Sequence, residues 1–215
     1  MRTDVWQALH KDLDHGVQED QETYAVPFEG HSILLPIRAL SDGKRGVASF
    51  ILNQASFWVV DAVADTLAQK LAPYQPDIIV GVPTLGLPLA EAVARRLGHT
   101  RIVPLSTSRK FWYDERLSVN MSSITSPEKE KRLYLDPRMI PLLTGQVAVI
   151  DDVLSSGSSI ASTLGLLHLQ QVEPVVIGTA MLQGTAWRSR VSQCPVEGAF
   201  ATPILHKTDA GWAAQ

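Results

Sequence analysis

The sequence predicts an α/β fold in which a doubly wound, mostly parallel sheet carries helices on both faces. Four short apolar runs bounded by turn residues are typical of strands buried on both sides, and they occupy residues 77–83, 101–105, 146–152 and 173–182. A helical pattern follows the first and the third run. This order predicts parallel units, because each crossover must return across a face of the sheet.

Three helices are predicted from apolar residues at helical spacing. Residues 55–72 contain no interior glycine or proline, and their valines and leucines recur at every fourth position. Residues 87–98 repeat the pattern and end at Gly98, a residue type favoured just after a helix. The third helix is expected at residues 158–170.

The other segments are predicted to stand outside this sheet, within a single domain over residues 1–215. The polar residues 1–30 are expected to form a short helix and a turn, whereas 32–38 and 47–53 should pair as a hairpin. Residues 106–137 form a long polar stretch with two alternating patterns. An antiparallel excursion acting as a flexible flap is predicted there, with a solvated hairpin of no function as the alternative.

Composition narrows the classes of function. The chain has 215 residues, 45% hydrophobic and 19% charged, and its net charge of −3 lacks the basic surplus of a non-specific nucleic-acid binder. No apolar run approaches the roughly 18 to 20 residues that cross a bilayer, and the acidic N-terminus has no signal-peptide core. The only cysteine, Cys194, fits a reducing compartment. We therefore expect a cytoplasmic protein without membrane or nucleic-acid partners.

The segment VAVIDDVLSSGSS, residues 147–159, carries the clearest chemical signal. An apolar strand ends in Asp151 and Asp152, and a loop of small residues turns from there directly into a helix. Ligands bind beyond the carboxyl ends of strands in an open parallel sheet, and free N–H groups at a helix N-terminus attract anions. Serine hydroxyls add donors, and Gly157 lets the backbone approach closely. The loop is therefore predicted to bind a phosphate.

The two aspartates indicate what else the ligand carries. Carboxylates accept hydrogen bonds from hydroxyls and neutralise divalent cations. A phosphorylated ribose bound with Mg²⁺ offers both. The alternative is a capping role in the turn, which would leave two carboxylates at a buried strand end without a partner. The six histidines show no zinc-site spacing, and no metal site built from side chains alone is predicted.

Residues 147–159 resemble the motif that binds phosphoribosyl pyrophosphate (PRPP) in type I phosphoribosyltransferases: an apolar strand, two acids and a loop rich in serine, threonine and glycine. The resemblance implies a small hood and a closing flap, and it implies that Asp151 and Asp152 hold the ribose hydroxyls. The residues that would complete the PRPP site, with the 5′-phosphate in the serine loop, are Val153, Leu154, Ser155, Ser156, Gly157, Ser158 and Ser159.

A second segment lies where that family has its pyrophosphate loop. Thr84, Leu85 and Gly86 follow the predicted strand at 77–83, and the resemblance assigns their backbone N–H groups to pyrophosphate. The family often has a strained non-proline peptide bond at this position. Without the resemblance, these residues would be interpreted as a plain turn between a strand and a helix.

The flap is most similar to that of the adenine and xanthine branches. Arg109 and Lys110 precede it, which implies that both bind the departing pyrophosphate and that they act in catalysis together with Asp152. Flap closure would exclude water from the reacting ribosyl group. Residues 111–115 depart from the branch pattern, because they are bulky and acidic.

The resemblance implies an enzyme that transfers the 5-phosphoribosyl group of PRPP to a nucleobase with release of pyrophosphate, and Mg²⁺ would bind with PRPP. The flap favours a purine base and nucleotide salvage, and members of the family are commonly homodimers. The base hood is expected from residues 1–45 and 183–215, and the aromatic candidates for stacking on the base are Trp112, Tyr113 and Trp187.

Two other functions share parts of this pattern. A non-catalytic regulator that senses PRPP or a nucleotide would use the same scaffold, and it would bind PRPP without releasing pyrophosphate. A Rossmann-type oxidoreductase or a haloacid-type phosphatase would need GxGxxG or DxD spacing, which the relevant strands lack.

Overall fold

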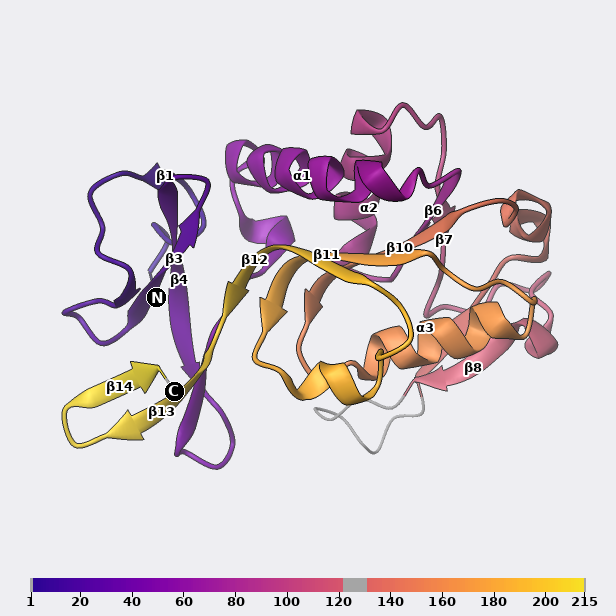
Figure 1. Cartoon of the computed structure of the whole chain (residues 1–215). Coiled ribbons are helices and arrows are strands. Elements are labelled where there is room, and N and C mark those ends of the chain that lie inside the picture. Colours follow the sequence, from indigo (N-terminus) through magenta and orange to yellow (C-terminus); the bar gives the residue numbers. More distant parts are fainter. Residues whose placement is uncertain (1, 122–130, 215) are drawn as a thin grey trace.

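The computed structural model describes residues 2–121 and 131–214, and its centre is a five-stranded parallel sheet in the order β12-β11-β10-β6-β7 (Figure 1). The strands of this sheet are β6 Ile78–Gly81, β7 Val103–Pro104, β10 Val147–Leu154, β11 Val176–Gln183 and β12 Val196–Thr202. The four strands expected from the apolar runs are confirmed. The sequence pattern had not suggested β12, which follows β11 at the sheet edge.

The strand order places a switch point between β6 and β10. From β6 the chain moves outward to β7, whereas β10 pairs with the other side of β6 and the later strands continue in that direction. Connections that leave neighbouring strands in opposite directions open a crevice at their carboxyl ends, which is where ligands bind in such sheets. The loops after β6 and β10 therefore border this crevice.

Helices cover both faces of the sheet, as expected. Helices α1 Phe57–Leu71 and α2 Gly86–Arg96 lie on one face, and α3 Ser158–His168 lies on the other (Figure 1). Along β10, Ala148 and Ile150 belong to the core under α1 and α2, whereas Val147 and Val149 belong to the core under α3. The strand is thus apolar on both sides because both sides are covered.

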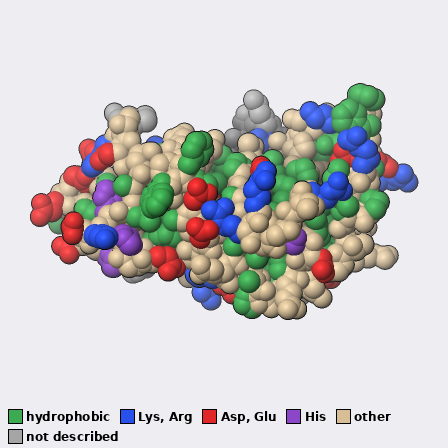
Figure 2. Space-filling model, turned by 90° about the horizontal axis from the view of Figure 1, so that it is seen from above, with side chains coloured by type: hydrophobic (Ala, Val, Ile, Leu, Met, Phe, Trp, Pro, Cys, Tyr) green, Lys and Arg blue, Asp and Glu red, His purple; other side chains and the backbone are tan. Residues whose placement is uncertain are grey.

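Ion pairs join the two helices of the first face at its surface. Arg96 at the end of α2 pairs with Asp61 at 2.8 Å and with Asp65 at 2.5 Å, both on α1. Figure 2 views this face and shows basic and acidic side chains side by side over the helices. Short 3₁₀ helices connect other elements at Leu52–Gln54, Ala72–Tyr74, Glu115–Leu117, Pro137–Leu142 and Ala186–Ser189, the last of which is η5.

The flap is antiparallel, as predicted. Strands β8 Ser118–Met121 and β9 Lys131–Tyr134 pair with each other, and the Ser162 hydroxyl of α3 donates to the Asn120 carbonyl at 3.2 Å. The flap therefore packs on the helix that begins at the serine loop. The middle of the predicted flap, 122–130, lies outside the described residues.

A second, antiparallel sheet unites the two ends of the chain beside β12 (Figure 1). Its strands are β1 Leu9–His10, β2 Gly16–Val17, β3 Thr23–Phe28, β4 His31–Ala39, β5 Arg45–Ala48, β13 Ile204–Thr208 and β14 Gly211–Ala214. The predicted pairing of β4 and β5 is confirmed, but β5 ends at Ala48, and the rest of the strand expected at 47–53 leads into a 3₁₀ helix at Leu52–Gln54. β5 also pairs with β13, where Gly46 lies opposite Leu205. Edge-to-face contacts of Phe28 and Phe50 with Phe200 of β12 join the two sheets.

The expected short helix in residues 1–30 is wrong. The described residues 2–30 form no helix, and they contribute β1, β2 and β3 to the second sheet. Residues Tyr24, Ala25 and Val26 of β3 are buried consecutively, and they belong to one core cluster with Trp6 of the N-terminal segment and Phe200 of β12. Long-range strand pairing thus outweighs local preference here. Among the described helices, none combines the length and apolarity that crossing a membrane requires.

Candidate active site

A pair of adjacent carboxyl groups lies near the carboxyl end of β10. Asp151 is only 6% exposed, and its Oδ1 accepts a hydrogen bond from the Asp152 N–H at 2.9 Å. Neither carboxyl group has a basic side chain within ion-pair distance among the described residues. Burial, reinforced by the neighbouring Asp152 carboxyl, raises the pKa of Asp151 well above its usual range, and burial also raises the pKa of Asp152. Two such groups are suited to a ligand that brings hydroxyl donors or a cation.

The loop after β6 lies directly against this pair. A Cβ atom added to Gly86 would lie 2.8 Å from the Asp151 Cα and 2.9 Å from its Oδ1, so only glycine allows this approach. The Pro83–Thr84 peptide bond is cis, at the position of the unusual peptide bond that the resemblance implied. Among the described residues, no side chain caps α2, which starts at Gly86. The N–H groups of Gly86 and Leu87, which precede Pro88, therefore remain available to an anion. The fold thus brings residues 84–86 and the two aspartates together.

The serine loop after β10 forms the N-terminus of α3. Gly157 has a φ of +79°, and an added Cβ there would lie 3.2 Å from the Trp187 Cα, so the turn needs glycine for two reasons. The Ser158 N–H donates to the Ser156 hydroxyl at 3.3 Å, and the two hydroxyl groups lie 3.1 Å apart. The other first-turn N–H groups and the hydroxyl donors at this helix end can bind a phosphate.

The sequence analysis did not identify one basic residue that contacts this loop, Arg190. Arg190 donates from Nη1 to the Ser156 carbonyl at 3.0 Å and to the Ser158 hydroxyl at 2.6 Å. It follows η5, in the connection that leaves the carboxyl end of β11. The predicted parallel pairing of β10 and β11 could have indicated this contact, because the loops that follow two adjacent parallel strands lie at the same edge of the sheet.

The two basic residues that precede the flap, Arg109 and Lys110, make no polar contact with the loops after β6 and β10 among the described residues. Arg109 forms an ion pair with Glu115 at 2.8 Å, and Lys110 is exposed. Among the described residues, neither side chain forms a hydrogen bond or ion pair with the loops after β6 and β10. Their roles toward pyrophosphate therefore stay predictions. Glu115 belongs to the acidic stretch in which this sequence departs from the flap pattern.

The bulky residues after Arg109 and Lys110 anchor the base of the flap. The Trp112 indole N–H donates to Asp136 at 3.1 Å, and the Arg138 guanidinium both lies over the indole ring and pairs with Asp136 at 2.6 Å. The bonds from Arg138, supported by the bond from Trp112, hold the pKa of the buried Asp136 carboxyl well below its usual range. Trp112 therefore serves the flap, where the sequence analysis had considered it for base stacking.

The other aromatic candidates for stacking also have packing roles. Trp187 is buried, and its indole N–H donates to the Gly184 carbonyl at 3.1 Å. Tyr113 packs on Tyr134 with ring centroids 6.0 Å apart. The structure thus assigns structural contacts to both rings.

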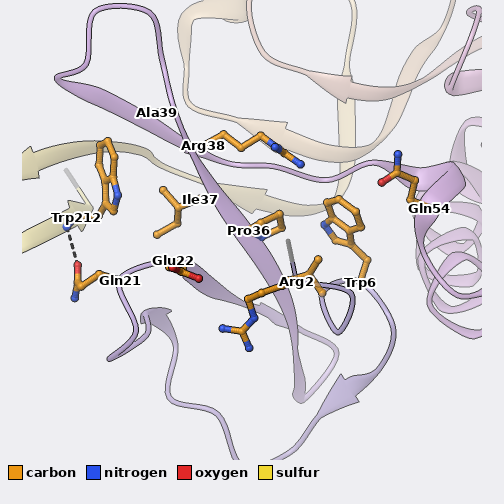
Figure 3. A pocket seen from close by; sticks show the side chains of 11 residues that line it. Arg2, Trp6, Gln21, Glu22, Pro36, Ile37, Arg38, Ala39, Gln54 and Trp212 are labelled. Atoms are coloured by element: carbon orange, nitrogen blue, oxygen red, sulfur yellow. Dashed lines mark hydrogen bonds between the residues drawn. The ribbon is translucent and has the colours of Figure 1, made fainter.

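A pocket of about 440 Å³ lies in the second sheet, between the N-terminal segment, the end of β4 and the C-terminal strand (Figure 3). Figure 3 shows Trp6 and Trp212 near its two ends, with Pro36 and Ile37 between them. The Gln21 side chain accepts a hydrogen bond from the Trp212 N–H at 2.7 Å. None of the site residues predicted from the sequence lines this pocket, so it is separate from the strand-end cluster.

Comparisons with known proteins agree with this geometry. Solved structures with the same fold include the adenine phosphoribosyltransferase from Saccharomyces cerevisiae in complex with an imino-altritol bisphosphate and adenine. This enzyme is 17% identical in sequence, and its TM-score is 0.59. The alignment covers 84% of the present chain and 96% of the yeast chain. The APRTase from Giardia lamblia with 9-deazaadenine is 18% identical with a TM-score of 0.59 (84% and 93% covered). The orotate phosphoribosyltransferase from Aeropyrum pernix is 18% identical with a TM-score of 0.52 (78% and 86% covered).

At these identities the structural likeness establishes the fold. No curated protein matches the sequence. The family model described as a phosphoribosyl transferase domain matches residues 49–197, which contain the whole parallel sheet except most of β12. The chain therefore belongs to the phosphoribosyltransferase family, as a PRPP-dependent enzyme of the type I fold.

Proposed function

We propose that this enzyme transfers the 5-phosphoribosyl group of PRPP to a purine base, in a reaction that requires Mg²⁺. The observation that carries the proposal is the meeting of two anion-binding loops at one pair of carboxyl groups. Gly86 of the first loop lies against Asp151, and Ser155, the first serine of the serine loop, stands three residues after Asp152. A phosphate, a vicinal diol and a pyrophosphate on one small molecule match these three features.

In this arrangement each part of PRPP has a protein partner. The serine loop binds the 5′-phosphate, and the N–H groups of residues 84–86 bind the pyrophosphate. Hydroxyl groups of the ribose donate to Asp151 and Asp152, which favours the ionised form of the buried Asp151 and the half-buried Asp152 and opposes the effect of burial on their pKa values. The carboxylates then face the ribose ring as positive charge develops on it, and they stabilise that charge electrostatically.

The chemical step exchanges one bond at the anomeric carbon for another. The bond to the pyrophosphate oxygen breaks, and its electron pair leaves with pyrophosphate. A ring nitrogen of the base attacks from the opposite face and supplies the electron pair of the new C–N bond, and its proton passes to an oxygen of the departing pyrophosphate. The protein contributes mainly position and charge, because both ends of PRPP are held while the base approaches. Arg109 and Lys110 add positive charge for the departing group when the flap closes.

The carboxyl pair also fits a cation delivered with the substrate. Within residues 2–121 and 131–214, no three metal-ligating side chains cluster to hold an ion by themselves. Mg²⁺ typically keeps several waters and binds through one or two carboxylates together with substrate phosphates, and Asp151 and Asp152 supply that number. When bound, the cation neutralises charge on the departing pyrophosphate.

The preference for a purine is supported by the flap and by the fold neighbours. The Arg109-Lys110 pair precedes a two-stranded flap, as in the adenine and xanthine branches of the family. The structural neighbours in yeast and Giardia were solved with adenine and 9-deazaadenine. Salvage of free purine bases follows as the proposed cellular role.

The test is release of pyrophosphate from PRPP with adenine, guanine, hypoxanthine, xanthine, uracil and orotate, with and without Mg²⁺. We expect release with a purine and Mg²⁺, and loss of release when both Asp151→Asn and Asp152→Asn are introduced. Asp209→Asn is the matched control, because this exposed carboxylate lies in the turn between β13 and β14. The control should release pyrophosphate at the wild-type rate.

Other results would change the proposal in defined ways. Release with orotate or uracil alone would refute the purine preference. PRPP binding without release with any base would identify a regulator that senses PRPP. Full activity after removal of both aspartate charges would refute the site itself.

We also propose that the enzyme acts as a cytoplasmic homodimer. Phe57 and Trp58 are adjacent at the start of α1 and are 88% and 72% exposed, and Phe111 before the flap is 94% exposed. Neighbouring large apolar side chains at such exposure favour a protein contact. Sedimentation velocity tests the dimer: a monomer at micromolar concentration would refute it, and in a dimer Phe57→Ser and Phe111→Ser should weaken association.

A further inference from the structure

The serine loop has no positive charge of its own. Residues 153–159 contain only apolar residues, serine and glycine, whereas a phosphate monoester carries roughly 1.5 to 2 negative charges near neutral pH. Among the described residues, Arg190 is the basic side chain that hydrogen-bonds to this loop. It lies in the connection that follows the neighbouring strand β11, so the contact joins the carboxyl ends of two adjacent strands.

We propose that Arg190 is the cationic binding residue of the 5′-phosphate subsite. This inference rests on the proposed function, since it assigns a partner to one group of PRPP. Nη1 holds the Ser156 carbonyl and the Ser158 hydroxyl, and Nε and Nη2 have no hydrogen-bond partner among the described residues. The planar guanidinium presents its donors as a fork suited to phosphate oxygens.

The position of Arg190 is held by the elements around it. The Arg190 N–H donates to the Trp187 carbonyl at 3.0 Å, and the Trp187 indole N–H is held by Gly184. Trp187 and Arg190 together line the place that a Gly157 Cβ would enter, with contacts of 3.2 Å and 3.3 Å. The connection after β11 therefore packs on the turn of the serine loop. A charge held in this way costs little ordering when the phosphate binds.

Arg190 also accounts for selection of phosphorylated ribose. The paired aspartates recognise hydroxyl groups, which ribose has with or without its phosphate. The exposed Arg190 guanidinium gains a charged hydrogen bond to the ligand only when the phosphate is present. The structure thus divides the recognition of ribose 5-phosphate between Asp151 with Asp152 on one side and Arg190 on the other.

The experiment measures affinity for ribose 5-phosphate and for pyrophosphate with Mg²⁺ by calorimetry, on the full chain. Arg190→Ala should weaken ribose 5-phosphate binding about 10- to 150-fold, the loss expected for a hydrogen bond to a charged group, and leave pyrophosphate affinity unchanged. Arg190→Lys should recover part of the loss, because it restores charge without the fork. In turnover, KM for PRPP should rise with little change in kcat.

Arg188→Ala is the matched control. Arg188 is also exposed and basic, but its guanidinium lies over the Trp187 ring at 5.1 Å, and it forms no hydrogen bond with the serine loop among the described residues. Its removal should leave both affinities unchanged. A thermal melt of each variant without ligand separates loss of binding from loss of folding.

The results distinguish this inference from the proposed function. Wild-type protein that binds neither ribose 5-phosphate nor PRPP would overturn both. Wild-type affinity for ribose 5-phosphate in Arg190→Ala would overturn the inference and leave the proposed function standing. Equal losses for ribose 5-phosphate and pyrophosphate, with a lower melting temperature, would assign Arg190 to general support of the fold and also overturn it.

Discussion

Replacing Asp151 by asparagine should make the free protein more stable while it weakens the binding of ribose 5-phosphate. The substitution keeps the shape of the side chain, and Oδ1 can still accept the Asp152 N–H. It removes a charge from a position that is 6% exposed and has no ion-pair partner among the described residues. Stability and ligand affinity should therefore change in opposite directions, as expected where a binding site is organised for its ligand.

The sign of the pH dependence follows from the raised pKa of Asp151. Between the ordinary pKa of an aspartate and the raised value, the folded protein binds more protons than the unfolded chain, so stability falls as pH rises through this window. Asparagine does not titrate. The advantage of Asp151→Asn should be absent near about pH 4 or below and greatest above the raised pKa.

The magnitude follows from the cost of a poorly satisfied buried polar group. That cost is about 1 to 3 kcal/mol, and each kcal/mol corresponds to roughly 2–4 °C in melting temperature for a domain of this size. Each hydroxyl bond to the carboxylate contributes about 1.5 to 3 kcal/mol, so affinity for ribose 5-phosphate should fall about 10- to 150-fold. Thermal melts at about pH 4 and pH 7.5, together with calorimetry, measure both effects.

Asp209→Asn serves as the exposed control and should change neither quantity. A melting temperature for Asp151→Asn at or below the wild-type value at neutral pH would refute the reasoning about its buried charge. Unchanged affinity for ribose 5-phosphate would refute its contact with the ribose.

Three further predictions, made with five substitutions, test other parts of the structure. Asp136→Asn should lower the melting temperature at neutral pH. The Asp136 carboxyl is as buried as that of Asp151, but its pKa is depressed, so its ionised form stabilises the fold above the ordinary aspartate pKa. The loss in melting temperature should shrink as pH falls below about 4. Gly86→Ala should destabilise the protein by about 1 to 3 kcal/mol and weaken pyrophosphate binding in calorimetry, since its Cβ would lie 2.8 Å from the Asp151 Cα. Gly165→Ala is the control, because a Cβ at this position of α3 would meet no other atom, and the substitution should be neutral or stabilising. An equal effect at both glycines would contradict the close approach of the loops after β6 and β10. Glu115→Gln should free Arg109 from its ion pair and lower KM for PRPP, whereas Arg109→Ala should reduce kcat more than PRPP affinity. If the kinetics of Glu115→Gln match the wild type, the ion pair does not compete with the substrate.

The parallel sheet and the serine loop could be predicted because their signals are local. Residues 147–159 contain in one stretch an apolar strand, two acids, a turn with Gly157 and a helix start, and each part is encoded by neighbours in the chain. The helices at α1, α2 and α3 were predictable for the same reason, since one face of each packs against a sheet and repeats at helical spacing.

The second sheet was not predictable from either end of the chain alone. Strands β4 and β5 gave a hairpin signal, but β5 also pairs with β13, about 160 residues later in the chain. The N-terminal residues 2–30 lack a strong local period, and they become strands only because β4 and β12 offer an edge and a surface to them.

The sequence by itself determined the parallel core, the paired acids and the phosphate loop, because periodicity, glycine and charge act over a few neighbouring residues. Only the tertiary structure decided which distant groups meet there. It placed Gly86 against Asp151 and Arg190 on Ser158, and it held Trp112 at the base of the flap with Asp136. Contacts of this kind depend on the order of strands in the sheet, which brings separate strand ends to one edge and leaves no pattern within either segment.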